Sequence, residues 1–193
     1  MLYKFARFVI AIIFYPLYRI KVIGKENIPE SGPVIICSNH ISNFDPPVVG
    51  ITSNRDISFM AKGELFEKPL LGRLLIGIKA FPVRRGLADR NALRNGLKIL
   101  EEGHTLGLFP EGTRSKTGEL GKPLSGVGFF ALRSKAVVVP CVIIGEYKPF
   151  SKTTVAYGKP MNVNTYRENK ASAKDMSEAI MEEIRNLYDI HKN

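Results

Sequence analysis

Short apolar runs alternate with amphipathic stretches along most of the chain, which is the pattern of an α/β protein. The longest apolar runs are typical of buried strands, and they cover residues 34–37, 57–61, 105–109 and 137–144. Shorter runs at 80–83 and 153–157 predict two further strands. Helical spacing of apolar residues predicts helices that start near Asp89 and Ala173. We therefore expect a single α/β domain with a largely parallel central sheet flanked by helices.

The segment from Phe8 to Tyr18 carries no charge, and basic residues flank it on both sides. It is too short to cross a bilayer, which needs about 20 apolar residues. Two interpretations stay open: a helix that packs on the domain, or a helix in the membrane interface with its aromatic rings at the acyl boundary. The aromatic residues and flanking cations favour the membrane-associated helix, with Pro16 ending or kinking it. We divide the chain accordingly into an N-terminal membrane-interface segment, 1–21, and a domain, 22–193.

Charge narrows the class of partner. The chain has 193 residues, a formal net charge of +10 and a pI of about 9.7, which favours anionic partners such as lipid head groups. No zinc-finger spacing, basic heptad region or aromatic RNA-binding strand is present, so nucleic acid is the weaker choice. Cys37 and Cys141 lie inside apolar runs, as buried core cysteines do. We expect neither a disulfide framework nor a metal site, and a reducing compartment.

The chemistry is expected just after the first buried strand, where His40 is followed five residues later by Asp45. In an α/β sheet, sites form outside the carboxyl ends of the strands. An imidazole can take a proton near neutral pH, and a carboxylate can fix its tautomer and stabilise its charged form. The alternatives are structural: a hydrogen-bonded turn histidine, and a helix N-cap for Asp45, which precedes Pro46.

Two other loops that follow predicted strands are suited to bind a phosphate. Arginine forks, a threonine hydroxyl and glycine-freed backbone N–H groups form such sites. The residues are Arg84 and Arg85 in one loop, and Glu111, Gly112, Thr113 and Arg114 in the other. The chain has no serine elbow, Walker loop or dinucleotide fingerprint, and neither cysteine has a cationic neighbour in sequence. The remaining mechanism is general-base catalysis, in which a side chain activates a hydroxyl of the substrate and no covalent enzyme intermediate forms.

Four ordered blocks make the sequence resemble the glycerolipid acyltransferase family. They are Asn39-His40 with Asp45, the stretch from Lys62-Gly63-Glu64-Leu65 to Phe81-Pro82-Val83-Arg84-Arg85, Phe109-Pro110-Glu111-Gly112-Thr113-Arg114-Ser115, and Val139-Pro140-Cys141-Val142-Ile143. The third block is the most specific. Two positions depart from the family pattern: Arg84 stands where an acidic residue is frequent, and Ser125 where a basic residue is frequent.

The resemblance implies an acyltransferase domain at 22–193. Its reaction would move a fatty acyl group from a thioester to the free sn-2 hydroxyl of 1-acyl-sn-glycerol-3-phosphate (lysophosphatidic acid), giving phosphatidic acid. His40 would be the general base and Asp45 its orienting partner. The implied substrate-binding residues are Arg85, Thr113 and Arg114 for the phosphate, Glu111 for positioning, and Lys62, Gly112 and Pro140 from their blocks. The apolar stretch 65–78 would shelter the acyl chain.

The resemblance also implies the partners and leaves alternatives. The donor would be acyl-coenzyme A or an acyl carrier protein, with no cofactor and no metal, and the enzyme would lie on the cytoplasmic face of a membrane as a peripheral or monotopic protein. Glycerol-3-phosphate or another lysophospholipid could be the acceptor instead. A different class also stays open, a membrane protein that binds anionic lipid and catalyses nothing.

Overall fold

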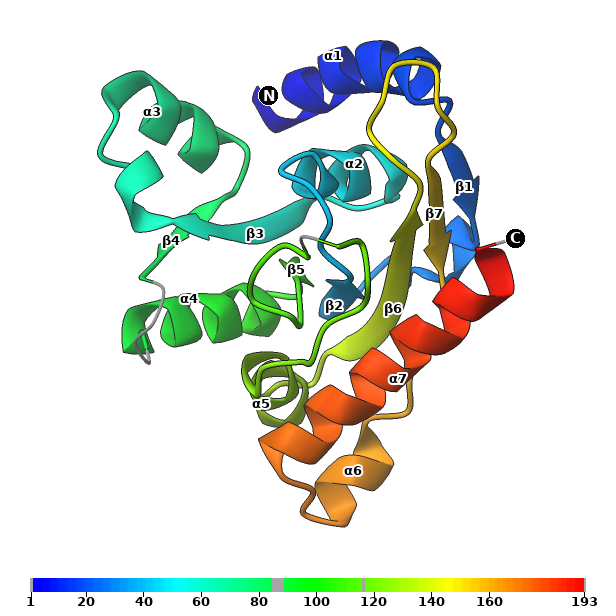
Figure 1. Cartoon of the computed structure of the whole chain (residues 1–193). Coiled ribbons are helices and arrows are strands. Elements are labelled where there is room, and N and C mark those ends of the chain that lie inside the picture. The colour runs from blue at the N-terminus through cyan, green and yellow to red at the C-terminus, as the bar shows by residue number, and fades with distance from the viewer. Residues whose placement is uncertain (1, 85–88, 116, 193) are drawn as a thin grey trace.

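The computed structural model describes residues 2–84, 89–115 and 117–192, which form an α/β structure (Figure 1). Two short 3-10 helices occur at Lys25–Asn27 and Gly63–Leu65. The remaining elements in chain order are α1 (Leu2–Leu17), β1 (Lys21–Ile23), β2 (Val34–Ser38), α2 (Asp45–Thr52), β3 (Ile57–Lys62), α3 (Pro69–Gly77), β4 (Phe81–Val83), α4 (Arg90–Glu101), β5 (Thr105–Leu108), α5 (Gly126–Arg133), β6 (Val137–Ile144), β7 (Thr154–Tyr157), α6 (Asn164–Glu168) and α7 (Ala173–His191).

The strands form one seven-stranded sheet in the order β1-β7-β6-β2-β5-β3-β4. Every neighbouring pair is parallel except β6 and β7, which run antiparallel. The predicted fold class, a single α/β domain with a largely parallel sheet, is confirmed. The pairing also places the short N-terminal strand β1 beside β7, at the edge of the sheet.

Helices cover both faces of the sheet, with α1 and α2 on one side and α4, α5 and α7 on the other (Figure 1). Alternate side chains of the central strand β2 point to opposite faces of the sheet. Ile35 and Cys37 belong to the core beneath α4, α5 and α7, whereas Val34 and Ile36 belong to the core beneath α2. All five residues of β2 are buried, as expected for a parallel strand covered on both sides.

The apolar periodicities of α4 and α7 correspond to buried stripes. Asp89 caps α4, because its carboxylate accepts from the N–H groups of Asn91 and Ala92. On α7, fully buried Met176, Ile180 and Ile184 face the sheet. The helix α5 crosses α7 closely at Gly128, where a β-carbon would overlap the carbonyl oxygen of Ala173.

The predicted N-terminal helix is longer than the uncharged segment and has two different faces. Its inner face packs on α2, and the hydroxyl of Tyr3 accepts a hydrogen bond from the N–H of Ile57 at 2.8 Å. The outer face is apolar and exposed, with Phe5 and Phe8 each more than half accessible and Ile12 and Ile13 beside them. The helix ends one residue after Pro16, as expected. Among the described residues, no helix has both the length and the apolar character needed to cross a membrane.

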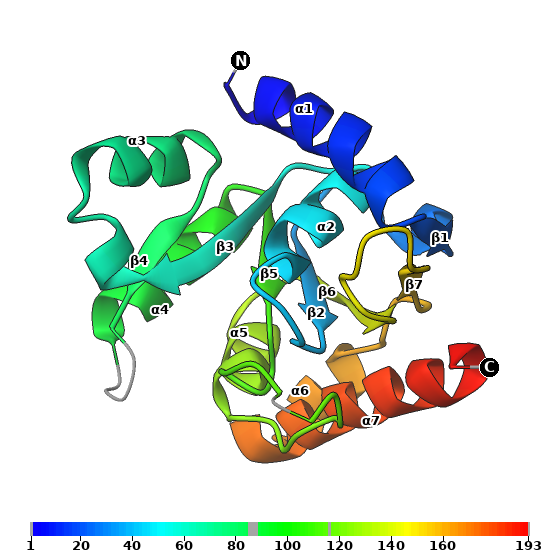
Figure 2. The same ribbon diagram turned by 45° about the horizontal axis from the view of Figure 1, so that its top comes forward.

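The helix α3 stands apart from the sheet, next to the N-terminal half of α1 (Figure 2). Only Gly72 of this helix is buried, and Leu70 and Ile76 are strongly exposed. The sequence predicts a helix that is buried or lines an apolar site. The observed α3 instead presents apolar side chains outward, and its last residue, Gly77, lies against the side chain of Leu2 in α1.

Candidate active site

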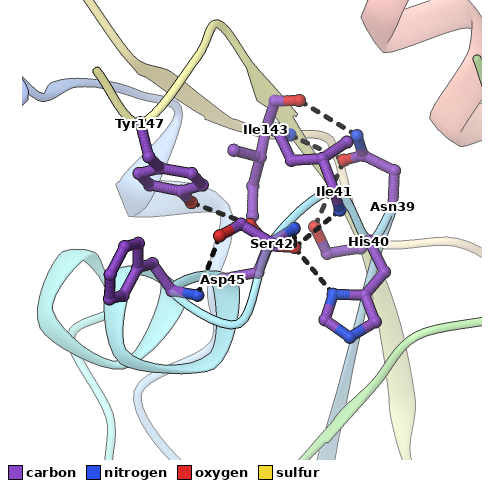
Figure 3. Close-up of polar contacts among 9 residues, drawn as sticks. Asn39, His40, Ile41, Ser42, Asp45, Ile143 and Tyr147 are labelled. Carbon is purple, nitrogen blue, oxygen red and sulfur yellow. Dashed lines mark hydrogen bonds and ion pairs between the residues drawn. The ribbon is translucent and has the colours of Figure 1, made fainter. Parts of the chain in front are cut away.

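The carboxyl ends of β2, β5 and β3 lie at one edge of the sheet because these strands are parallel neighbours. Here Nδ1 of His40 is 2.7 Å from Oδ2 of Asp45 (Figure 3). The carboxylate of Asp45 is fully buried, and the imidazole is 7% exposed. The pair that the sequence places five residues apart is therefore a direct hydrogen-bonded contact inside the protein.

Three further donors hold the Asp45 carboxylate. The N–H groups of Ile41 and Ser42 each donate to Oδ2 at 2.7 Å, and the hydroxyl of Tyr147 donates to Oδ1 at 2.8 Å. Together with His40, these donors fix the orientation of the carboxylate. The predicted N-cap role of Asp45 is wrong: Phe44 is the N-cap, and Asp45 is the first helical residue with its side chain turned to the loop. The two prolines after it fit the first turn, where no N–H partner is needed.

A second buried contact fixes the loop that carries His40. The side-chain amide of Asn39 donates to the carbonyl of Ile143 at 3.0 Å and accepts from the N–H of Ile143 at 2.7 Å. Asn39 thus extends the pairing between β2 and β6 by one residue beyond β2, using its side chain in place of backbone. Because the amide is buried and both of its groups are paired, His40 is delivered to a defined place.

The histidine ring lies flat on Phe109, the first residue after β5, with ring centroids 4.1 Å apart and an 18° angle between planes. With Nδ1 donating to Asp45, the neutral ring carries its lone pair on Nε2, which points away from the carboxylate (Figure 3). Within the described part of the chain, Nε2 has no hydrogen-bond partner. The imidazole is therefore arranged to accept a proton from a molecule bound in front of it.

His40 lines a cavity of about 660 Å³, a volume typical of small-molecule sites. Apolar side chains dominate its wall, and many of them come from β3, α4 and α5. They include Met60, Leu93, Val127, Phe129 and Phe130. The imidazole of His40, which can accept a proton, and mainly apolar side chains line the same cavity. The cavity therefore suits a ligand with a polar reacting group and an apolar chain.

The predicted phosphate-binding residues are only partly brought together. Arg84 and Gly112 line the cavity with His40, and exposed Thr113 and Arg114 follow Gly112 in the same loop. Arg85 lies outside the described residues. Lys62 ends β3 with an exposed side chain and is not among the residues that line the cavity, although its partner in β4, Val83, is. Pro140 is buried within β6, opposite Cys37, and also does not line the cavity.

Glu111 is buried beside this loop rather than exposed in it. Its Oε1 accepts from the N–H of Gly121 at 3.1 Å. Burial raises the pKa of Glu111, and backbone groups of Gly121 and His40 oppose that shift with smaller effects. The left-handed backbone of Gly112, at φ 66°, lets the chain turn directly after this carboxyl group. Glu111 therefore organises the loop from inside.

We expect Glu111→Gln to change how stability depends on pH. A folded-state pKa above the unfolded value means that the folded chain binds the proton more tightly, so this contribution is present at low pH and is lost as pH rises through the folded pKa. Urea unfolding of both proteins from acid to neutral pH should show wild type losing stability relative to the variant. The exposed Glu119→Gln supplies the control, and a difference that does not vary with pH would contradict the expectation.

The two cysteines are not nucleophiles in this arrangement. Both are fully buried, and burial raises the pKa of Cys141 to about 12 and that of Cys37 further. A thiol with such a pKa stays protonated near neutral pH and is a weak nucleophile. The described residues also include no cluster of three or more histidine, cysteine, aspartate or glutamate side chains that could hold a metal ion.

Two functional contacts escape the sequence analysis. Tyr147 follows β6 and is 102 residues from Asp45 in sequence, so no local motif links them. A polar aromatic residue just beyond a predicted strand end is the only local signal. Phe109 is visible as part of the third block, but its stacking on His40 depends on β5 and β2 being neighbours.

The fold and the site define a class: an α/β protein whose buried histidine–carboxylate pair opens onto an apolar cavity at the carboxyl edge of a parallel sheet. The sequence model of the Acyltransferase family matches residues 19–144, more than half of the chain, and the chain belongs to that family. Membership of a family of acyltransferases favours an enzyme over the alternative of a lipid-binding protein without catalytic activity.

Several relatives carry names more specific than the family. A 1-acyl-sn-glycerol-3-phosphate acyltransferase of Bacillus subtilis is 30% identical over 195 residues, covering 96% of each chain. One of Borreliella burgdorferi is 31% identical over 139 residues, covering 71% of this chain and 56% of its own. The chain spans only 39% of a chloroplastic relative from Arabidopsis thaliana, named 1-acyl-sn-glycerol-3-phosphate acyltransferase, at 31% identity over 72% of this chain.

A solved structure shares the fold. The crystal structure of the 1-acyl-sn-glycerophosphate acyltransferase PlsC from Thermotoga maritima matches 96% of this chain and 78% of its own, with a TM-score of 0.74 and 24% sequence identity. At this level of identity the likeness establishes the architecture alone.

Proposed function

We propose that the protein transfers a fatty acyl group from a thioester to the sn-2 hydroxyl of 1-acyl-sn-glycerol-3-phosphate, giving phosphatidic acid. The observation that carries the proposal is the His40–Asp45 pair, whose second ring nitrogen faces a cavity lined mainly by apolar side chains. The names of the Bacillus subtilis and Borreliella burgdorferi relatives support the choice of acceptor.

The proposed mechanism uses His40 first as a base and then as an acid. Nε2 takes the proton of the acceptor hydroxyl while that oxygen attacks the thioester carbonyl, forming a tetrahedral intermediate. Asp45 stabilises the imidazolium through the 2.7 Å contact with Nδ1. When the intermediate collapses, the carbon–sulfur bond breaks, and the imidazolium returns its proton to the departing thiolate. The products are an ester and a free thiol, with His40 neutral again.

The cavity is the proposed place for an acyl chain. Its wall is formed by β3, α4 and α5 residues such as Met60, Leu93 and Val127, and no residue of α3 lines it. The apolar stretch 65–78 therefore does not form this shelter. Burying a hydrocarbon chain in such a cavity contributes about 0.8 kcal/mol per CH₂ group, so chain length should affect binding strongly.

The acceptor phosphate is proposed to bind at the loops that follow β4 and β5. Arg84 lines the cavity, and the exposed Thr113 and Arg114 extend the same loop from Gly112. Arg85 stays a candidate from the family motif. Both donors, acyl-coenzyme A and an acyl carrier protein, remain compatible with a basic surface, because each carries negative charge.

The proposed location is the surface of a membrane, on its cytoplasmic face, with α1 as the contact. The outer face of α1 exposes Phe5, Phe8, Ile12 and Ile13. Basic residues stand at both ends of the helix, and the whole chain carries a net charge of +10. An apolar face with flanking cations fits an anionic bilayer, where rings enter the acyl boundary and cations meet head groups. The helix α3, which exposes Leu70 and Leu74, lies beside the N-terminal half of α1 (Figure 2).

We expect the double substitution Phe8→Ser with Ile12→Ser to weaken binding to vesicles that contain anionic lipid. Two apolar side chains leave the interface, which should reduce the partition coefficient at least about tenfold. Sedimentation with vesicles measures the bound fraction. Ile190→Ser, a similarly exposed apolar position near the end of α7, is the matched control and should bind as wild type does. Equal binding by the double variant would contradict the assignment of α1.

A thiol-release assay tests the reaction itself. Purified protein is given lysophosphatidic acid with acyl-coenzyme A or acyl carrier protein, across several acyl lengths, and phosphatidic acid is identified by mass. Glycerol-3-phosphate and a lysophospholipid without a terminal phosphate run in parallel. We expect turnover with lysophosphatidic acid to exceed the others. Turnover that is greatest with a different acceptor would replace the proposed substrate, and no thiol release with either donor would overturn the reaction.

A further inference from the structure

Tyr147 touches Asp45 from outside the family's sequence blocks. It lies in the loop between β6 and β7, residues 145–153, and donates its hydroxyl hydrogen to Oδ1 of Asp45 at 2.8 Å. His40 and two backbone groups occupy the other carboxylate oxygen. The Tyr147 hydroxyl is thus the single described donor to Oδ1. It reaches the carboxylate from the side opposite His40 (Figure 3).

The ring of Tyr147 belongs to a four-member aromatic cluster that reaches α1. The members are Phe14 and Tyr18 from the end of α1, Phe44 from the turn before Asp45, and Tyr147. Tyr147 contacts Tyr18 edge-on with centroids 5.3 Å apart, and Phe44 at 5.6 Å. Phe14 meets Phe44 at 5.5 Å and Tyr18 at 5.1 Å, again edge-on. Edge-to-face contacts at these distances are stabilising and orientation-dependent.

Backbone hydrogen bonds tie the same loop to the end of α1. The N–H of Phe150 donates to the carbonyl of Leu17 at 2.6 Å, and the N–H of Thr153 donates to that of Tyr18 at 3.0 Å. The loop that carries Tyr147 therefore takes its position from α1 as well as from the two strands that it joins. Both views show the loop curling next to the end of α1 (Figures 1 and 2).

We propose that Tyr147 is a positioning residue for the His40–Asp45 pair, and that α1 sets its position through the aromatic cluster. The helix that carries the exposed apolar face is thereby linked to the groups at the reacting end of the cavity. A shift of the α1 end moves Tyr18 and Phe14 against Phe44 and Tyr147, and so rotates the Asp45 carboxylate. The inference rests on the proposed function, because it concerns the efficiency of the same base.

The expected direction of the pH effect follows from charge. A hydroxyl that donates to Oδ1 spreads the negative charge of Asp45, so its removal leaves the carboxylate attracting a proton on His40 more strongly. The titratable groups that face this site are His40, Asp45, Tyr18, Cys141 and Glu111. Burial raises the pKa values of Cys141 and Tyr147, so both stay neutral over the range of interest. Glu111 is therefore the buried group, besides His40 and Asp45, whose titration can contribute to the dependence of kcat on pH.

Tyr147→Phe is the direct test, because it removes the hydroxyl and keeps the ring in the cluster. We expect the acidic limb of the kcat profile to move about half a pH unit upward, so that kcat falls about threefold on that limb, with KM for both substrates changed by less than about twofold. Activity should recover as pH rises. Tyr166→Phe, a partly buried tyrosine on α6, is the matched control and should behave as wild type.

The link to α1 is tested with Phe14→Ala, which removes an edge contact with Phe44 and touches neither Asp45 nor the cavity. We expect the same upward shift of the acidic limb. The combination with Tyr147→Phe should be less than additive, since both changes act on one carboxylate. Vesicle binding should stay at the wild-type level because Phe14 is on the inner face of α1.

Each outcome has one meaning. A Tyr147→Phe enzyme with unchanged kcat, or with a loss of kcat that is uniform across pH, would overturn the positioning role. Repeating the pH profile in the Glu111→Gln variant removes the titration of Glu111 from the comparison. Additive losses in the double variant would overturn the link to α1. The proposed function fails separately, through a His40→Ala protein that retains normal turnover, so failure of Tyr147→Phe alone leaves the reaction intact.

Discussion

Replacing His40 by alanine should lower kcat by at least about 10²–10⁴, the usual contribution of a positioned general base. The imidazole is the group whose nitrogen faces the cavity, and its other nitrogen is committed to Asp45. The fold should survive, because the ring packs against Phe109 at the rim of the cavity and is not part of either hydrophobic core.

The measurement is thiol release with lysophosphatidic acid over a range of pH, together with a thermal melting curve for each protein. His104→Ala is the matched control. That histidine directly precedes β5, at the end of the strand opposite the candidate site, and its side chain is 60% exposed. Its turnover should equal that of wild type. A folded His40→Ala enzyme with near-normal kcat would remove the base from the mechanism and require a different proton acceptor.

Asp45→Asn is expected to reduce kcat by about 10²–10⁴ while preserving the local structure. The amide oxygen can take the place of Oδ2 and keep the donors from His40, Ile41 and Ser42, and the amide NH₂ can donate to the Tyr147 hydroxyl oxygen. What is lost is the negative charge that stabilises the imidazolium. The substitution therefore separates charge from geometry at this position.

The double variant makes this expectation sharper. Because Asp45 acts through His40, His40→Ala with Asp45→Asn should lose no more activity than His40→Ala alone. Asp189→Asn on the exposed side of α7 is the control for removal of one carboxylate. Losses that multiply in the double variant would show that Asp45 has an effect independent of His40, such as direct contact with the acceptor.

Much of the sheet could be predicted because its strands are buried on both faces. The apolar runs at 34–37 and 137–144 are short and rich in β-branched residues, which favours buried strands over helices. The three-residue edge strand β1 lacks such a run, and its identity depends on β7, far away in sequence. The short helix α6 has no apolar periodicity to reveal it. Local pattern fails where pairing with a distant element decides the structure.

The candidate site likewise contains residues that local sequence spacing predicts and residues that only the arrangement of the sheet brings together. His40 and Asp45 are close in sequence at a strand end, so their contact follows from local spacing. The side chain of Tyr147 reaches Asp45 only because β6 lies next to β2 in the sheet. For residues 65–78 the sequence predicts a role that the structure does not support. The residues are apolar, but their composition cannot show that the side chains of α3 point outward, beside α1, and not toward the cavity.

The pairing of β1 with β7 has a consequence for biosynthesis. The strand that anchors the end of α1 gains its partner only after nearly the whole sheet has left the ribosome. At about 5–20 residues per second, the nascent chain waits on the order of ten seconds before that edge can close. If α1 contacts the membrane as proposed, it would be free of its final anchor throughout this delay and could meet the lipid surface before the sheet is complete.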